Sequence, residues 1–432
     1  MIQEIENRIA EEPDSHGIYS QKTADALHAD YTIRGKIALV DADLLDGGTR
    51  HPNLVIMKLS GYFKEHGCSV RLIEDYSELF QGVPDMPALN VYSGVYQYDA
   101  IYISKVFDFT RIDRRLLNFS NVYFGGTGFF FDHAPKLPDY IEHHMPDYSV
   151  YDSYIKNDTR HKNKEKYFND YLNFSIGFAT RGCFRQCDFC VNHACKSINH
   201  HSHISEWLDP SRKYIYLWDD NILGYPGWRN VFEELMATGK RFQFRQGMDM
   251  RLMTEEKAKV LSQCKYYGDY IFAFDHPEDA PVIEKKLTLW RTYCDKATKL
   301  YVLTGFDGID ENEVVSVFER IRILLKYGCY PYIMRHENIQ NSPYKGLFTQ
   351  IARWCNQPQF IKKVSFREYC HQCQTYHKGK GYGAPMRALT DFESRFPEIA
   401  EKYFDMKYLE QPYVIELKKK LAEKARKRKE TA

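Results

Sequence analysis

The chain has no long apolar run, no excess of charge of either sign, and no basic segment followed by an apolar one at its start. No apolar run approaches the roughly 20 residues that span a bilayer, so no membrane-spanning protein is expected. The 59 Lys and Arg against 58 Asp and Glu give a formal net charge of +1, which does not indicate a nucleic acid or an anionic membrane as partner. Because the first residues also lack a secretory signal, we expect a soluble cytoplasmic protein.

The composition is that of a folded protein with more than one domain. Hydrophobic residues make up 44% and aromatic residues 15% of the 432 positions, which is ample for packed cores. The length suits two domains and a small third. The 11 Cys are an odd number, and three of them are clustered, which fits a reducing compartment better than a disulfide framework.

Those three cysteines, Cys183, Cys187 and Cys190, form a C-x3-C-x2-C run. A cubane iron–sulfur cluster has four irons, so three thiolates from one loop would leave the fourth iron open to chelate a small molecule. A zinc site is more often built from two separated pairs of ligands. The alternative is three unrelated buried thiols, because free cysteine is often a small core hydrophobe.

The run resembles the cluster loop of the radical S-adenosylmethionine (SAM) superfamily, in its spacing, in Phe189 before the last Cys and in the Thr-Arg-Gly lead-in from Thr180. The resemblance implies a [4Fe–4S] cluster whose open iron binds SAM. It also implies reductive cleavage of SAM to methionine and a 5′-deoxyadenosyl radical, with reduced flavodoxin or ferredoxin as electron donor. We expect Cys195, five residues further on, not to be a ligand, since a fourth thiolate would close the cluster.

Residues 35–155 alternate short apolar runs with helical periods. Apolar runs at 36–40, 70–73, 100–104 and 121–124 predict strands, and 53–66 predicts a helix that stops at Gly67. Strands joined by helical lengths are typical of a parallel sheet, so we predict an α/β, doubly wound, Rossmann-like domain with a ligand crevice at the carboxyl ends of its strands.

This domain resembles the cobalamin-binding type that precedes the radical domain in many such enzymes, including a glycine pair at Gly125-Gly126. Where that family shows Asp-x-His-x-x-Gly, this chain has Asp41-Ala-Asp-Leu-Leu-Asp-Gly47, without the histidine. Cobalamin is therefore a candidate cofactor without its usual ligand. The other interpretation is a domain that keeps the fold and covers the substrate side.

Six strand-like runs with intervening helices follow, over residues 170–340. They lie at 174–180, 214–218, 241–245, 270–274, 300–304 and 331–334, with helices near 254–264 and 311–327. We predict a partial (β/α)6 TIM-type barrel with its chemistry at the carboxyl ends of the strands. The layout resembles the radical SAM core. The flanking parts are then an arm at 1–34, a linker at 156–169 and a C-terminal extension at 341–432.

Polar residues at the strand ends are the candidates for binding SAM. Asp219 and Asp220 resemble the acidic pair that binds the SAM amino group in methylthiotransferase-like members, although helix capping by Asp220 would also explain them. The run after the third predicted strand has two interpretations. Its side chains form hydrogen bonds to the ribose and the carboxylate of SAM, or Asp249 and Arg251 form a surface ion pair. The candidates in this run are Gln246, Asp249 and Arg251. Gly305, after the fifth predicted strand, is a further candidate because a glycine lets the backbone approach adenine closely.

Two further sets are weaker candidates. Asp275 and His276, with Arg335 or His336, end the fourth and sixth strands and are candidate substrate contacts, although a lone histidine is more often structural. An auxiliary zinc or iron–sulfur site, or a thiol pair without metal, is expected in the C-terminal extension. Its candidate ligands are Cys355, Cys370, Cys373 and His377.

The sequence therefore predicts a radical SAM enzyme acting on an unidentified small molecule or RNA. Two subtypes remain open, a cobalamin-dependent methyltransferase and an RNA-modifying enzyme. The second is supported by the basic tail at 418–429, which a solvated terminal helix would also explain. The alternative from another class is a non-catalytic module holding zinc or a closed iron–sulfur cluster.

Overall fold

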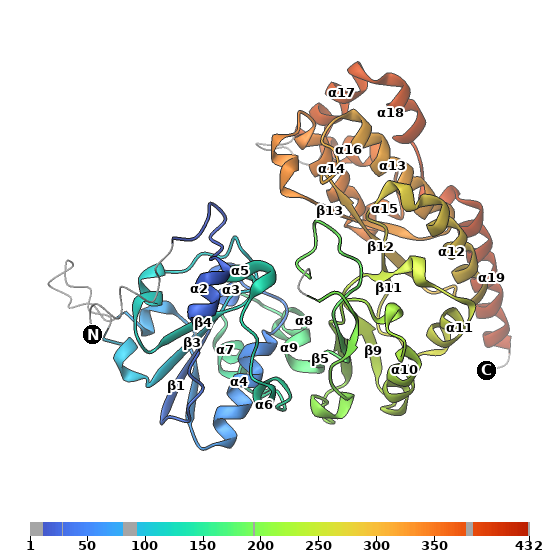
Figure 1. Cartoon of the computed structure of the whole chain (residues 1–432). Coiled ribbons are helices and arrows are strands. Elements are labelled where there is room, and N and C mark those ends of the chain that lie inside the picture. Colours follow the sequence, from blue (N-terminus) through green and yellow to red (C-terminus); the bar gives the residue numbers. More distant parts are fainter. Residues whose placement is uncertain (1–11, 28, 81–92, 193–194, 377–382, 431–432) are drawn as a thin grey trace. The chain divides into compact units, whose positions relative to one another are not determined.

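The computed structural model describes residues 12–27, 29–80, 93–192, 195–376 and 383–430. The chain divides into two compact units, here called the N-terminal unit (1–218) and the C-terminal unit (219–432). Figure 1 shows strands and helices alternating along most of the chain. The predicted domain boundaries stay a prediction, and each unit is described by itself.

A four-stranded parallel sheet forms the centre of the N-terminal unit, in the order β2-β1-β3-β4. This confirms the predicted α/β class with parallel strands, and each strand lies within a residue or two of its expected place. The strands are β1 (Lys36–Asp41), β2 (Ser69–Leu72), β3 (Ala100–Ser104) and β4 (Val122–Gly125).

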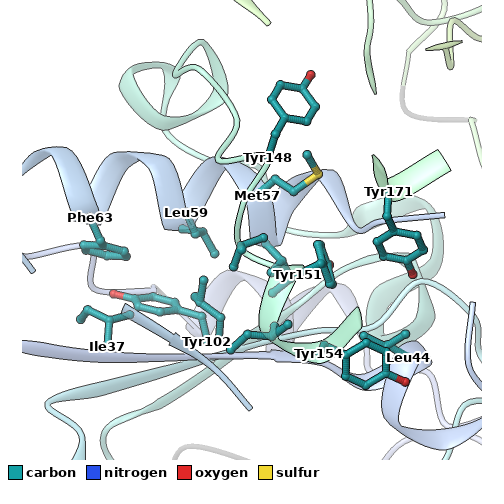
Figure 2. Packing of buried hydrophobic residues seen from close by; sticks show 14 of the residues in the cluster. Ile37, Leu44, Met57, Leu59, Phe63, Tyr102, Tyr148, Tyr151, Tyr154 and Tyr171 are labelled. Atoms are coloured by element: carbon teal, nitrogen blue, oxygen red, sulfur yellow. The ribbon is translucent and has the colours of Figure 1, made fainter. Parts of the chain in front are cut away.

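Helix α4 (Leu54–Glu65) covers part of this sheet, as the apolar period predicted. Its N-cap is Asn53, whose side chain accepts from the N–H groups of Val55 and Ile56. Phe63 on its buried face stacks on Tyr102 of β3, with ring centroids 5.3 Å apart. Figure 2 shows the tyrosines that extend this core. Burial of this aromatic cluster supplies the apolar area that holds helix and sheet together.

The flanking segments of this unit are packed as well. Tyr19, within the expected N-terminal arm, is buried against Phe124 and Phe130. Phe168, within the expected linker, is fully buried in the same core as Phe63. The remaining helices are α2 (Gln21–Ala26), α3 (Ala42–Asp46), α5 (Thr127–Phe130), α6 (Asp139–Glu142), α7 (Asp152–Asn157), α8 (Lys164–Tyr167) and α9 (Asn169–Asn173).

The N-terminal unit also holds a second parallel pair and a short hairpin. Strand β5 (Phe174–Gly177) pairs with β8 (Tyr214–Leu217), and β6 (Thr180–Arg181) pairs antiparallel with β7 (Asn199–His200). The sequence predicted β5 and β8 but not the hairpin. Its strands of two residues are too short to show a hydrophobic period.

A parallel sheet in the order β10-β11-β12-β13 organises the C-terminal unit. Its strands are β10 (Met248–Asp249), β11 (Tyr270–Ala273), β12 (Thr298–Thr304) and β13 (Tyr330–Arg335), and β9 (Arg241–Phe244) is bridged to Tyr266 through Phe242. The helices between strands are α10 (Trp228–Ala237), α11 (Glu255–Gln263), α12 (Ala280–Tyr293) and α13 (Glu311–Lys326). Closure into a (β/α)6 barrel stays a prediction.

A group of helices follows β13. They are α14 (Lys345–Cys355), α15 (Pro358–Ile361), α16 (Phe366–Tyr376), α17 (Ala384–Arg395), α18 (Pro397–Tyr403) and α19 (Pro412–Glu430). Phe366 and Phe404 pack around Phe318 of α13, so an aromatic core joins this extension to the rest of the C-terminal unit. Among the described residues, no helix has both the length and the apolar character needed to cross a membrane.

Candidate functional site

The three clustered cysteines lie on the loop that joins β6 to β7, here called the cysteine loop (residues 182–198). The strands pair Thr180 with His200 and Arg181 with Asn199. The Cys183 N–H, two residues after Arg181, donates at 3.4 Å to the carbonyl of Cys195, four residues before Asn199. The loop is therefore closed at its base by backbone pairing, which brings its ends together independently of any ligand.

The cysteine side chains suit a thiolate ligand set. All three are half-buried, and the N–H of Arg185 donates to Cys183 Sγ at 3.3 Å. A turn joins Cys187 to Cys190, whose N–H donates to the Cys187 carbonyl at 2.9 Å. Within the part of the chain that the structure describes, no three His, Cys, Asp or Glu side chains are gathered at metal-binding distances. The fit to a cluster rests on the donor types and their common loop.

Gly182 has no room for a side chain. Its φ of +94° favours glycine, and an added Cβ would collide with the Ser197 carbonyl oxygen and lie 3.1 Å from Cys195 Sγ. This explains the glycine of the Thr-Arg-Gly lead-in by the packing of the hairpin base. It also places the Cys195 thiol against Gly182; that Cys195 is not a ligand stays a prediction.

Gly182→Ala is expected to disrupt the cysteine loop. The collision adds to the strain of a left-handed residue. We therefore expect the folded loop to be destabilised by more than about 3 kcal/mol and the bound iron to fall several-fold. Gly239→Ala is the matched control, because Gly239 also has a positive φ (+68°) but no atom within 4 Å of an added Cβ. Iron content after anaerobic reconstitution measures the effect. Equal iron in the two variants would contradict the packing argument.

A second feature of this unit ties the hairpin to the helices beside the sheet. His201, just after β7, contacts Glu142 of α6 at 3.1 Å, and Lys58 of α4 contacts the same carboxylate at 2.8 Å. Burial alone would raise the pKa of Glu142, but the His201 hydrogen bond and the Lys58 charge together lower it to about 2. The hairpin that carries the cysteines is thus anchored by an ionised carboxylate, which sequence reasoning did not find.

At the carboxyl ends of β1 and β3, where a doubly wound domain binds ligands, the structure has a buried polar network. Tyr151 donates to Asp41 at 2.8 Å and accepts from the Asn53 N–H at 3.0 Å, and Asn53 donates to Ser104 at 2.8 Å. All four residues are buried. These polar groups satisfy one another.

The loop compared above with a cobalamin loop has a structural task of its own. Asp43 accepts the N–H groups of Val106 and Phe107 at 2.7 and 3.2 Å, which fixes the segment after β3. An added Cβ at Gly126 would collide with the Lys105 carbonyl oxygen, so packing alone requires that glycine. The groups here that suit a flat cofactor are apolar. Phe107 and Phe109 are exposed and stack on each other, with ring centroids 5.2 Å apart. These contacts fit a corrin ring face but supply no metal ligand.

Asp41 makes the stability of the N-terminal unit depend on pH. Burial raises the pKa of Asp41 from 3.8 to about 7, partly offset by the Tyr151 hydrogen bond. The folded protein therefore binds more protons than the unfolded chain between these values, and stability falls as pH rises through that window. We therefore compare the free energy of unfolding of Asp41→Asn with that of the native protein, measured in urea. From pH 4 to pH 8 this difference should shift in favour of the variant by roughly 4 kcal/mol. A constant difference across this range would contradict the assignment.

In the C-terminal unit, Asp219 is buried and Asp220 is half-buried. Gln246 is exposed in the loop after β9. Asp249 is buried, and Arg251 Nε lies 2.7 Å from its carboxylate while Nη1 lies 2.8 Å from Asp279. The ion pair of Asp249 with Arg251, one of the two interpretations, is thus present, and it is partly buried. That these residues bind SAM stays a prediction.

The ends of β11 and β12 bring charged side chains together. Burial raises the pKa of Asp275 to about 6, against the lowering effect of the Arg320 charge and of His276. His276 Nδ1 lies 3.5 Å from Asp307, which follows β12. A half-buried carboxyl group whose pKa is raised to about 6, next to a histidine in the chain, is suited to proton transfer.

The other two strand-end candidates have structural partners. Gly305 has a φ of +81°, and an added Cβ would collide with Ile339 Cγ1. The backbone conformation and the packing therefore require glycine at this position. Arg335 is exposed and donates to Thr349 at 2.8 Å. Their roles toward adenine and substrate stay predictions.

The C-terminal cysteines do not gather around a point among the described residues. Cys355 and Cys370 are buried, and burial raises the pKa of both thiols, which disfavours the thiolate that a metal requires. Cys373 is half-buried one turn after Cys370 on α16. His377 lies outside the described residues. The auxiliary site stays a prediction.

Sequence reasoning also missed a buried pair on α13, Glu313 and Arg320. They lie seven residues apart, so they share a helix face, next to the apolar stripe that predicted the helix. Two opposite charges at this spacing beside a buried stripe are a pattern that could have pointed to a buried ion pair.

No family model and no curated protein matches the chain. Two solved structures of the radical SAM methyltransferase TsrM from Kitasatospora setae are similar to it at 12% identity. The one with cobalamin and a [4Fe–4S] cluster bound has a TM-score of 0.45 and covers 80% of this chain and 79% of its own. The one with tryptophan substrate and the SAM analogue aza-SAM has a TM-score of 0.44 and covers 67% and 71%.

Proposed function

We propose that the chain is a radical SAM enzyme. The observation that carries the proposal is the cysteine loop: three half-buried cysteines at C-x3-C-x2-C spacing on one hairpin loop that follows a parallel strand. Cys183, Cys187 and Cys190 are the proposed ligands of a [4Fe–4S] cluster. When bound, the cluster supplies the electron that cleaves SAM reductively.

The chain's own contribution begins with holding the cysteine loop. Backbone pairing of β6 with β7 and the absent side chain of Gly182 fix the base of the loop. The Arg185 N–H donates a hydrogen bond to Cys183 Sγ. Phe189, half-buried between the second and third cysteines, is proposed to face the bound SAM. Reduced flavodoxin or ferredoxin is the proposed electron donor.

The proposed SAM-binding residues follow strands of the C-terminal unit or the strand preceding it. Asp219 and Asp220 would bind the ammonium group by charge, and Gln246 and Asp249 the ribose hydroxyls by hydrogen bonds. Arg251, which is paired with Asp249 and Asp279, is the proposed partner of the carboxylate. The backbone at Gly305 would contact adenine.

Asp275, His276 and Arg335 are the proposed substrate contacts. The raised pKa of Asp275 lets its carboxyl group accept or donate a proton near neutral pH. The next residue, His276, places its Nδ1 3.5 Å from Asp307. Positioning the substrate and excluding water are what the protein adds to chemistry that belongs to its cofactors.

Two subtypes are compatible with this proposal. Cobalamin-dependent methyl transfer is supported by the parallel sheet and by the exposed Phe107 and Phe109, which follow β3 at its carboxyl end. Modification of RNA is supported by the basic helix α19, whose lysines and arginines suit phosphates. Added cobalamin, tested for binding by its visible spectrum, separates the two.

A non-catalytic module holding zinc or a closed cluster is the competing function, and the open iron decides between them. We expect the anaerobically reconstituted protein to show a [4Fe–4S] electron paramagnetic resonance signal that changes when SAM is added. An unchanged signal, or zinc in place of iron, would favour the module.

A further inference from the structure

A buried ion pair lies beneath the strand ends of the C-terminal unit. Arg320 is 2% and Glu313 7% exposed, and Arg320 Nη2 lies 3.2 Å from Glu313 Oε1. Taking two charges out of water carries a desolvation cost that their mutual attraction often does not repay, so such a pair is a poor source of stability. Its contacts indicate another purpose.

Arg320 bonds the main chains of two neighbouring strands at once. Its Nη1 donates to the carbonyl of Asp275 at 2.6 Å and to the carbonyl of Leu303 at 2.7 Å. Asp275 comes two residues after β11 ends, and Leu303 is the last residue but one of β12. A planar guanidinium is the side chain that can hold two carbonyls in a fixed geometry.

Glu313 fixes the last residue of β12 and the residue that follows it. Its Oε1 accepts the Thr304 hydroxyl at 2.7 Å and the Gly305 N–H at 3.2 Å. The pair therefore bonds, through one carboxylate and one guanidinium, the backbone or side chains of Asp275, Leu303, Thr304 and Gly305. Removal of either charge would leave the other buried without its counter-ion.

We propose that Glu313 and Arg320 are positioning residues of the SAM reaction, an inference that rests on the proposed function. They hold the backbone at Gly305, assigned to adenine, and at Asp275, assigned to substrate, in one fixed relation. Neither side chain needs to touch SAM or substrate, because each acts through the main chain that it bonds. Catalysis depends on such placement, since small displacements of a binding group cost large factors in rate.

Two conservative variants separate positioning from folding. Arg320→Lys keeps the charge but not the two-pronged geometry, and Glu313→Gln keeps an acceptor oxygen but not the charge. Lys326→Gln is the matched control, because Lys326 is on the same helix and its ion pair with Glu284, at 2.8 Å, is exposed. Iron content and thermal unfolding of the full chain are measured beside SAM affinity and the pH profile of SAM cleavage.

We expect both variants to retain the native iron content and to bind SAM at least tenfold more weakly, with a shifted pH profile, while Lys326→Gln matches the native protein. Folded variants with native SAM affinity and pH profile would overturn the inference and leave the proposed function standing. Failure of both variants to fold would assign the pair to stability alone and overturn it too. If the native protein itself binds no SAM, the proposed function fails, and the inference fails with it.

Discussion

Cys187→Ala is expected to lose the iron–sulfur cluster. After anaerobic reconstitution the native chain should hold about four irons and four sulfides, because three thiolates suffice to bind a cubane with one open iron. Loss of one of three protein ligands leaves two, which we expect to reduce bound iron at least tenfold. Iron and sulfide analysis with electron paramagnetic resonance measures this. Cys183→Ala and Cys190→Ala should behave alike.

Cys195→Ala is the control for that experiment. Cys195 lies on the same loop, is half-buried like the other three, and its carbonyl pairs with the Cys183 N–H, which the substitution retains. We expect full iron content and an unchanged response to SAM. Loss of the cluster in this variant would make Cys195 a fourth ligand, closing the cluster and favouring an electron-transfer module.

Asp219→Asn is expected to weaken SAM binding by ten- to a hundredfold. A charged hydrogen bond contributes about 1.5–3 kcal/mol, and a buried carboxylate facing an ammonium group is screened less than an exposed one. Asp219 is buried and Asp220 half-buried, so Asp220→Asn should have the smaller effect. Equilibrium dialysis with SAM on reconstituted protein measures the dissociation constants.

Asp295→Asn serves as the control. Asp295 precedes β12, at the amino end of the strand and away from the carboxyl ends, and it accepts a hydrogen bond from the Tyr413 hydroxyl. The Asp295→Asn variant should bind SAM with the affinity of the native protein. If Asp219→Asn and Asp220→Asn also bind SAM with native affinity, the acidic pair is a capping feature and not a SAM site.

The sequence predicts most strands of this chain because buried parallel strands are short apolar runs. The helix expected at 311–327 is found at Glu311–Lys326, since its stripe and its stop at Gly328 are local features. The segment 156–169 was expected to be a linker because it is polar and lacks periodicity. One aromatic side chain near its end, Phe168, is buried in the core, which no pattern of charges reveals, and the linker stays a prediction.

The candidate site was less accessible to sequence reasoning because its supports come from distant parts of the chain. The hairpin that closes the cysteine loop pairs Arg181 with Asn199, across seventeen intervening residues. Gly305 invites an explanation by ligand approach, but Ile339, more than thirty residues away, already occupies the space. Such contacts depend on tertiary packing, and local spacing carries no trace of them.

The most direct test of the proposed function is the product of SAM cleavage. The reconstituted chain is incubated anaerobically with SAM and dithionite, and 5′-deoxyadenosine is quantified by mass spectrometry beside Cys187→Ala. We predict 5′-deoxyadenosine from the native chain and none from the variant. A native chain that carries a full cluster and yields no 5′-deoxyadenosine would contradict the radical SAM assignment.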